Sequence, residues 1–382
     1  MTSCLARAIL LVLVAAASVS AQGPGFADLK QRIDRLSSFD FAERTDAARA
    51  LRRAAPSDIV PALIDAAQHH SDQFVRYRAL VLLTAFNDRR TPDLMRSLLP
   101  DRNDRVREVV YRWFEQHPDP ALSATLMAAI ETEQAEFVRP ALIRALAALP
   151  YSDRLQRALV AEAGRGFDFF RSAVIESLGE HHADFAVEAI VSIALVEGPL
   201  QDDAVLALGR IGGSRASSVL STLTNPSAEL APAAQAAQCL IGRDCPERIE
   251  WLTKTAQASA ARAETVRAAL AALSALTSQD NRDAAAALVA LSISTSDLRD
   301  EVGVAYSAAA LRNPDVTLEW LANASAALQV VAIDLLHSGF ERLEEDFAEE
   351  QFFAAARAAY WAAGEGSATR VLMATVIDKL EF

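Results

Sequence analysis

The sequence predicts an all-α protein, an α-solenoid (superhelix) of about ten stacked helix-turn-helix repeats of about 32 residues each. Three observations lead to this fold class. Alanine, leucine and arginine dominate the chain, and these residues favour helices. One short motif recurs at a nearly constant spacing, and helix-start residues precede the apolar segments.

The recurring motif is an acid or amide, two further residues and then an arginine, at the start of an apolar helix. Successive arginines are 31, 32 and 32 residues apart over the first four copies, and the fifth follows after 96 residues, or three periods. Degenerate units around 204–208 and 236–240 fill that gap, and Asp300–Gly303 continues the series with glycine in place of arginine. The motif arginines are Arg76, Arg107, Arg139, Arg171 and Arg267.

Each repeat contains two helical patterns. The first begins after a breaker such as Ser57-Asp58 or Pro92-Asp93, and the second begins at the arginine motif. This arrangement resembles the HEAT repeat, in particular the short repeats of phycobilisome-lyase-like proteins, from about Phe39 to about Trp361. The resemblance implies an elongated superhelix with one continuous core and an extended groove for binding or scaffolding. We expect capping helices over 26–37 and 367–380, and a single domain over 22–382.

The N-terminus has the pattern of a secretory signal peptide over residues 1–21. Arg7 precedes an apolar stretch that ends at Ala17, and small residues lead to a predicted cleavage site after Ala21. The stretch is shorter than the roughly 20 apolar residues that span a bilayer. We therefore expect a periplasmic or extracellular protein that does not insert into a membrane after cleavage.

Charge is distributed unevenly along the chain. Residues 28–180 carry 23 acids and 22 bases, whereas residues 181–382 carry 27 acids and 14 bases. An acidic surface of this kind repels nucleic acid and favours cationic partners. The run of acids between Glu341 and Glu350 is expected to be a solvated helix face, with cation binding as the alternative.

The repeated arginine occupies an electrostatically unfavourable position. A cation in the first turn of a helix opposes the helix dipole, so its repetition indicates a fixed partner. We expect a ladder in which each arginine pairs with a carboxylate of a neighbouring repeat; an anion-binding ridge is the alternative. Arg112 and Arg144 share a second repeat position and, with Tyr111, are candidates for binding a partner in the inner groove.

Other motifs restrict the function classes. Cys239 and Cys245 are the two cysteines outside the signal peptide, and in an exported protein a disulfide between them is favoured over a metal site. His69-His70 and His181-His182 are adjacent pairs that lack the three- or four-residue spacing of helical metal ligands.

The sequence contains no phosphate-binding loop, nucleophile elbow or zinc-protease helix. We therefore expect no cofactor and no catalytic residue. The favoured function is a non-catalytic scaffold that binds another protein or peptide. An enzyme or enzyme subunit of the HEAT-like lyase type is the alternative, by analogy of fold alone.

Overall fold

The computed structural model describes residues 26–223, 226–258 and 262–381, and within these ranges it is built from helices and contains no strand. The predicted signal peptide, residues 1–21, lies outside the described residues. The helices are α1 (Phe26–Asp34), α2 (Phe41–Arg52), α3 (Pro56–His69), α4 (Gln73–Thr84), α5 (Thr91–Leu98), α6 (Asp104–Gln116), α7 (Ser123–Thr132), α8 (Arg139–Ala147), α9 (Asp153–Ala163), α10 (Asp168–Glu180), α11 (Val187–Ala194), α12 (Gln201–Ile211), α13 (Gly213–Thr222), α14 (Ala231–Leu240), α15 (Cys245–Gln257), α16 (Ala263–Ser278), α17 (Arg282–Ser294), α18 (Arg299–Arg312), α19 (Pro314–Asn323), α20 (Ala326–Leu343), α21 (Asp346–Ala362) and α22 (Ala368–Leu380).

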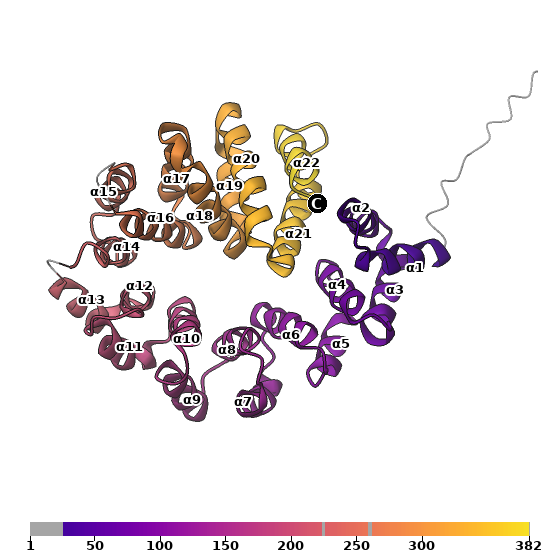
Figure 1. Ribbon diagram of the computed structural model, residues 1–382, viewed down its shortest axis with the longest axis horizontal. Helices are drawn as coiled ribbons and strands as arrows, with labels where there is room; N and C mark the ends of the chain where they lie inside the picture. Colours follow the sequence, from indigo (N-terminus) through magenta and orange to yellow (C-terminus); the bar gives the residue numbers. More distant parts are fainter. Residues whose placement is uncertain (1–25, 224–225, 259–261, 382) are drawn as a thin grey trace, which may run out of the picture.

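The helices form the two layers expected of a helical repeat. From α3 to α18 the odd-numbered helices lie on the outside and the even-numbered helices line the inside, and α20 packs on α18 in the same series (Figure 1). Successive inner helices pack directly on one another, as do the two helices of each repeat. The all-α solenoid predicted from the 32-residue period is confirmed.

Local sequence explains the helix boundaries. Asp72 caps α4 and Asn103 caps α6, because each side chain accepts a hydrogen bond from a backbone N–H of the first turn. Proline occupies the first turn of α3, α5 and α19, where its missing N–H costs no helical hydrogen bond.

Small residues bring inner helices of the C-terminal half close together. A Cβ on Gly209 of α12 would lie 2.6 Å from the Cα of Ala237 in α14, and a Cβ on Gly339 of α20 would overlap Ser307 and lie 2.5 Å from the carbonyl oxygen of Gly303, both in α18. Close approach of neighbouring inner helices favours a curved solenoid.

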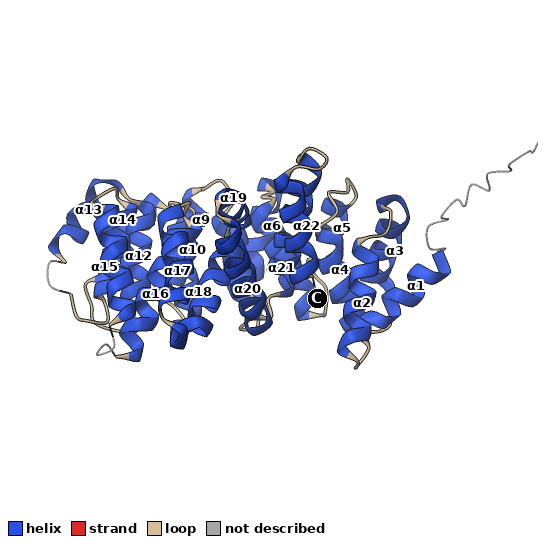
Figure 2. Ribbon diagram, turned by 90° about the horizontal axis from the view of Figure 1, so that it is seen from above, coloured by secondary structure: helices blue, strands red, loops and turns tan. Residues whose placement is uncertain are grey.

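The curvature closes the solenoid on itself. The sequence predicted an elongated superhelix with an open groove, but the chain curls until its C-terminal helices lie against its N-terminal ones (Figures 1 and 2). Helix α21 packs against α4 as well as against α18 and α19. The segments predicted as caps are helical as α1 and α22, and Asp378 of α22 and the following Glu381 contact Arg53 of the first repeat.

Candidate functional site

Ion pairs between distant parts of the chain hold the solenoid closed, and we call this contact the closing seam. At one end Arg52 of α2 lies 2.7 Å from Glu350 of α21 and 3.8 Å from Glu381. The side chains of these three residues are 7%, 0% and 2% exposed. Arg49 also donates a hydrogen bond of 2.8 Å to the backbone carbonyl of Glu381. The first repeat and the last helix are therefore joined through buried charges.

The middle of the closing seam is formed by the start of α21. Asp346 accepts hydrogen bonds from the Tyr77 hydroxyl and forms an ion pair with Arg78, both on α4. Burial by itself would raise the pKa of Asp346, but the adjacent Arg78 and Tyr77 lower that pKa below its usual value. Glu345 lies 2.8 Å from Arg112 of α6. Asp346 is thus held in its ionised form by the N-terminal half.

The third part of the closing seam joins α18 to α8, α10 and α12. Arg312 of α18 lies 2.5 Å from Glu176 and 2.6 Å from Glu180, both on α10. Arg144 of α8 binds the same two carboxylates at 2.7 and 2.9 Å. Burial opposes ionisation of Glu176, but the guanidinium groups of Arg312, Arg144 and Arg210 lower its pKa to about 2.

The acidic run in the C-terminal half is therefore only in part the solvated helix face that we expected, since Glu341 and Glu344 are exposed but the acids from Glu345 to Glu350 are not. Glu345, Asp346 and Glu350 face arginines of α6, α4 and α2, and Glu350 is fully buried. The cationic partner suggested by the charge asymmetry is, for these acids, the N-terminal half of the same chain. The sequence prediction failed because it compared each segment only with its neighbours in the sequence.

The motif arginines of the first repeats lie in a shared environment. Arg76 pairs with Asp101, Arg107 pairs with Glu133 through two contacts of 2.7 and 2.8 Å, and Arg139 pairs with Glu162 at 3.2 Å. In each pair the carboxylate lies in the last turn of, or just after, the outer helix that follows the arginine's own helix.

Backbone carbonyl oxygens complete the coordination of these arginines. Arg76 donates to the carbonyl of Ala67, and Arg139 donates to that of Ile130, both near the end of the preceding outer helix. Each guanidinium thus joins the preceding outer helix to the next repeat, and also offsets the negative end of that helix's dipole.

Two of the predicted ladder arginines differ from the first three. Arg171 donates to the carbonyl of Ala163, but its ion pair is with Asp168 of its own helix. Arg267 is 66% exposed, and its ion pair is with Glu264, again within its own helix, so among the described residues it is not part of the ladder. The ladder is therefore a feature of the N-terminal half.

The three residues predicted to bind a partner in the groove have different surroundings. Arg112 and Arg144 do face the inside, but the closing seam engages both of them. Tyr111 is 3% exposed and faces into the repeat, because consecutive helical residues point about 100° apart. Burial raises the pKa of its phenol to about 12. Tyr111 is therefore not accessible to a partner, whereas Arg112 and Arg144 stay partly exposed on the inside.

Cys239 and Cys245 are joined by a disulfide, with their Cα atoms 4.3 Å apart. Gly242 lies between them with φ +79°, and this left-handed conformation ends α14 and turns the chain into α15. The amide of Asn281 lies 3.2 Å from the sulfur of Cys245. The crosslink therefore fixes the junction of two repeats whose arginine motif is degenerate.

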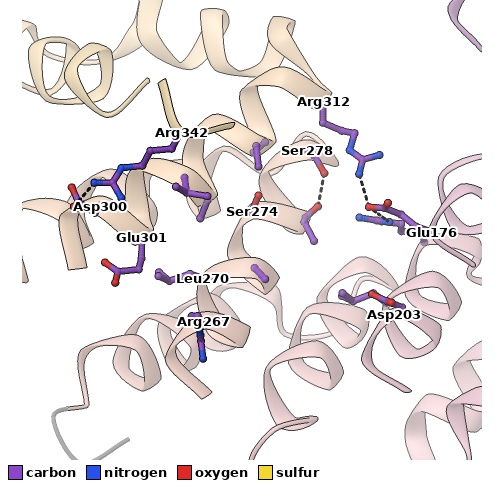
Figure 3. A pocket seen from close by; sticks show the side chains of 18 of the residues that line it. Glu176, Asp203, Arg267, Leu270, Ser274, Ser278, Asp300, Glu301, Arg312 and Arg342 are labelled. Atoms are coloured by element: carbon purple, nitrogen blue, oxygen red, sulfur yellow. Dashed lines mark hydrogen bonds and ion pairs between the residues drawn. The ribbon is translucent and has the colours of Figure 1, made fainter. Parts of the chain in front are cut away.

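Ring closure leaves an inner chamber of about 630 Å³ between α10, α12, α16, α18 and α20 (Figure 3). Its centre is lined by small and apolar residues of α16 and α18, such as Leu270 and Ser274. Charged residues lie at both ends, with Glu176, Asp203 and Arg312 at one end and Arg342 paired with Asp300 at the other. Burial raises the pKa of Asp203 to about 6.

Exposed phenylalanines occupy one repeat position along the edge of the N-terminal half. They lie within two residues of the starts of even-numbered helices, and successive phenylalanines are 33, 63 and 32 residues apart. The gap of 63 residues skips one repeat, in which Arg105 takes the same position. Because stacking places equal repeat positions side by side, these rings line one edge of the solenoid. We call them the aromatic rim: Phe41 (64% exposed), Phe74 (39%), Phe137 (46%) and Phe169 (69%).

Part of the aromatic rim opens into a cleft between the two halves of the ring, which we call the rim cleft. This cleft of about 610 Å³ is bordered by Phe137 and Phe169 and by residues of α6, α18 and α21. Four glutamates and three arginines line it. Phe169 also borders a smaller pocket of about 310 Å³ with the 76% exposed Phe167.

A family model for HEAT repeats matches residues 29–112. The chain therefore contains HEAT repeats. No curated protein matched the sequence. HEAT repeats form helical scaffolds that commonly mediate protein interactions, and the chain shares this architecture. The resemblance to phycobilisome-lyase-like repeats stays a prediction.

Neither the aromatic rim nor the closing seam was predicted from the sequence. The sequence does contain a signal for the rim, because Phe74, Phe137 and Phe169 directly follow the acid or amide of the recurring motif. The signal for the seam was the excess of acids in the C-terminal half. Of the helices that the structure describes, none has the length and apolar character needed to cross a bilayer.

Proposed function

We propose that this chain is an exported, non-catalytic scaffold that binds another protein along its aromatic rim. The observation that carries this proposal is the exposure of phenylalanine at one position in four of five neighbouring repeats. Exposed aromatic residues that gather on one surface mark interaction sites, since a soluble chain rarely keeps such side chains in water.

The closing seam favours the aromatic rim over the concave groove as the binding surface. In an open solenoid the concave groove is the natural binding surface, but here α21 packs against α4 and its first residues pair with arginines of the inner helices. The edge of the solenoid stays accessible, and its apolar rings are spaced by the repeat. An extended segment of a partner protein would contact several repeats at once.

Export is proposed from the N-terminal sequence. A basic residue, an apolar stretch and a small-residue cleavage site precede the first helix. The disulfide between Cys239 and Cys245 fits an oxidising compartment.

The experiment is a pull-down from an envelope extract with the mature protein as bait. A matched bait carries Phe137→Ser and Phe169→Ser, and a control bait carries Trp361→Ser, which removes an equally exposed aromatic residue that is not part of the aromatic rim. We expect a protein that the wild type and the Trp361→Ser bait retain and that the double variant loses. Equal recovery with all three baits, or no recovery, would contradict the proposal.

A further inference from the structure

The rim cleft contains one carboxylate that forms no ion pair with the part of the chain that the structure describes. Arg112 pairs with Glu108 and Glu345, and Arg144 and Arg312 both pair with Glu176. The fourth glutamate of the cleft is Glu115 of α6. Among the residues that the structure describes, Glu115 takes part in no ion pair and no hydrogen bond.

The surroundings of Glu115 disfavour its charge. Burial raises its pKa above the usual value, although Arg144 and Arg312 act in the opposite direction. The four glutamates and three arginines that line the rim cleft leave one excess negative charge. A cation that enters the cleft would therefore interact with the Glu115 carboxylate in place of the water lost on burial, and it would balance the excess charge.

The mouth of the rim cleft is aromatic and suits the apolar part of a ligand that carries a cation. Phe137 and Phe169, 46% and 69% exposed, border it from neighbouring repeats. Aromatic faces attract ammonium and guanidinium groups and bury the alkyl stems of lysine and arginine. The cleft thus combines an unpaired carboxylate inside with apolar rings at its entrance.

We propose that the rim cleft captures a lysine or arginine side chain of the partner protein, flanked there by apolar residues that pack on Phe137 and Phe169. This inference rests on the proposed function, because it assigns the chemistry of the segment that docks on the aromatic rim. It also assigns Glu115 as the residue that selects a basic segment over a neutral or acidic one.

The test uses purified mature protein and two fluorescein-labelled heptapeptides, Gly-Ser-Leu-X-Leu-Ser-Gly, in which X is lysine or norleucine. Fluorescence anisotropy gives the ratio of the two dissociation constants. We expect the wild type to bind the lysine peptide at least about fivefold more tightly, which corresponds to about 1 kcal/mol. The Glu115→Gln variant should lose this preference.

Glu197→Gln is the matched control, since it removes one negative charge from an exposed loop. This variant should keep the lysine preference, whereas Phe137→Ser with Phe169→Ser should weaken binding of both peptides. Equal affinity of the wild type for both peptides, or an unchanged preference in Glu115→Gln, would overturn the inference. If the pull-down partner still depends on Phe137 and Phe169 in that case, the proposed function stands and only the assignment of the cation fails.

Discussion

The ion pair between Arg52 and Glu350 gives the sharpest prediction about stability. The Arg52 Nε lies 2.7 Å from a carboxylate oxygen of Glu350, and the two side chains are 7% and 0% exposed. Replacing Arg52 with methionine keeps much of the apolar stem but leaves the carboxylate buried without this partner. Breaking a buried pair from one side costs about 3–5 kcal/mol.

The structure places Arg52→Met at the lower end of that range. Glu350 retains Arg357 at 3.0 Å, and Glu381 retains Arg53 at 3.1 Å, so neither carboxylate becomes wholly unpaired. We expect a loss of about 3 kcal/mol. Because stacked repeats are stabilised mainly by their neighbours, the first consequence should be opening of the ring with the repeats still helical.

The assay is urea unfolding followed by circular dichroism, with small-angle scattering in the absence of urea. Arg215→Met is the matched control, because Arg215 pairs with Glu188 at 2.8 Å on the outer surface, where both side chains are more than half exposed. That change should have a much smaller effect, because solvent screens an exposed pair. If Arg52→Met were no more destabilising than Arg215→Met and left the scattering profile unchanged, the reasoning about the closing seam would be refuted.

Four further predictions concern single features. Arg107→Ala breaks a two-contact pair with a nearly buried carboxylate and should cost about 2–4 kcal/mol in thermal unfolding with no loss of helical signal in the native state; an unchanged melting temperature would contradict the ladder. Burial and the neighbouring Asp346 raise the pKa of Glu349 to about 7. The folded state therefore holds this proton more tightly than the unfolded chain, and the wild type should lose about 1–2 kcal/mol of stability relative to Glu349→Gln as the pH rises from 5 to 8. A difference in unfolding free energy that stays constant over that range would argue against the raised pKa. Thiol titration of the unreduced, denatured mature protein should find no free thiol, and two free thiols would mean that Cys239 and Cys245 are not bridged. Intact-mass analysis of exported protein should give a chain that begins after Ala21, whereas retention of the first 21 residues would contradict the signal peptide.

The sequence was sufficient to predict the repeat architecture because that architecture is local. The 32-residue period, the caps and the apolar stripes all act within one repeat or between neighbours, and they place α4, α6, α8 and α10 where the structure has them. The pairing of Arg107 with Glu133 has the same origin, since equal positions of stacked repeats lie side by side.

Ring closure is not encoded in any such local pattern. Arg52 and Glu350 are 298 residues apart, and their contact depends on small changes of angle accumulated over all the intervening repeats. Close contacts such as that of Gly209 with Ala237 set part of this curvature, but no period in the sequence reports it. The phenylalanines of the aromatic rim can be found from the sequence because they recur with the repeat. The rim cleft beside Glu115 cannot be found in this way, because it forms only when α18 and α21 are in place.

The measurement that tests this account most directly is the distance between α2 and α22 in solution. Spin labels are introduced at Ala42 and Lys379, both exposed, through unnatural amino acids so that the native disulfide is kept. Double electron–electron resonance on dilute protein should give a single narrow distribution at short distance, because Arg49 and Arg53 of the first repeat contact Glu381. A broad distribution at long distance would show an open solenoid and contradict the closing seam, the rim cleft and the functional assignment built on them.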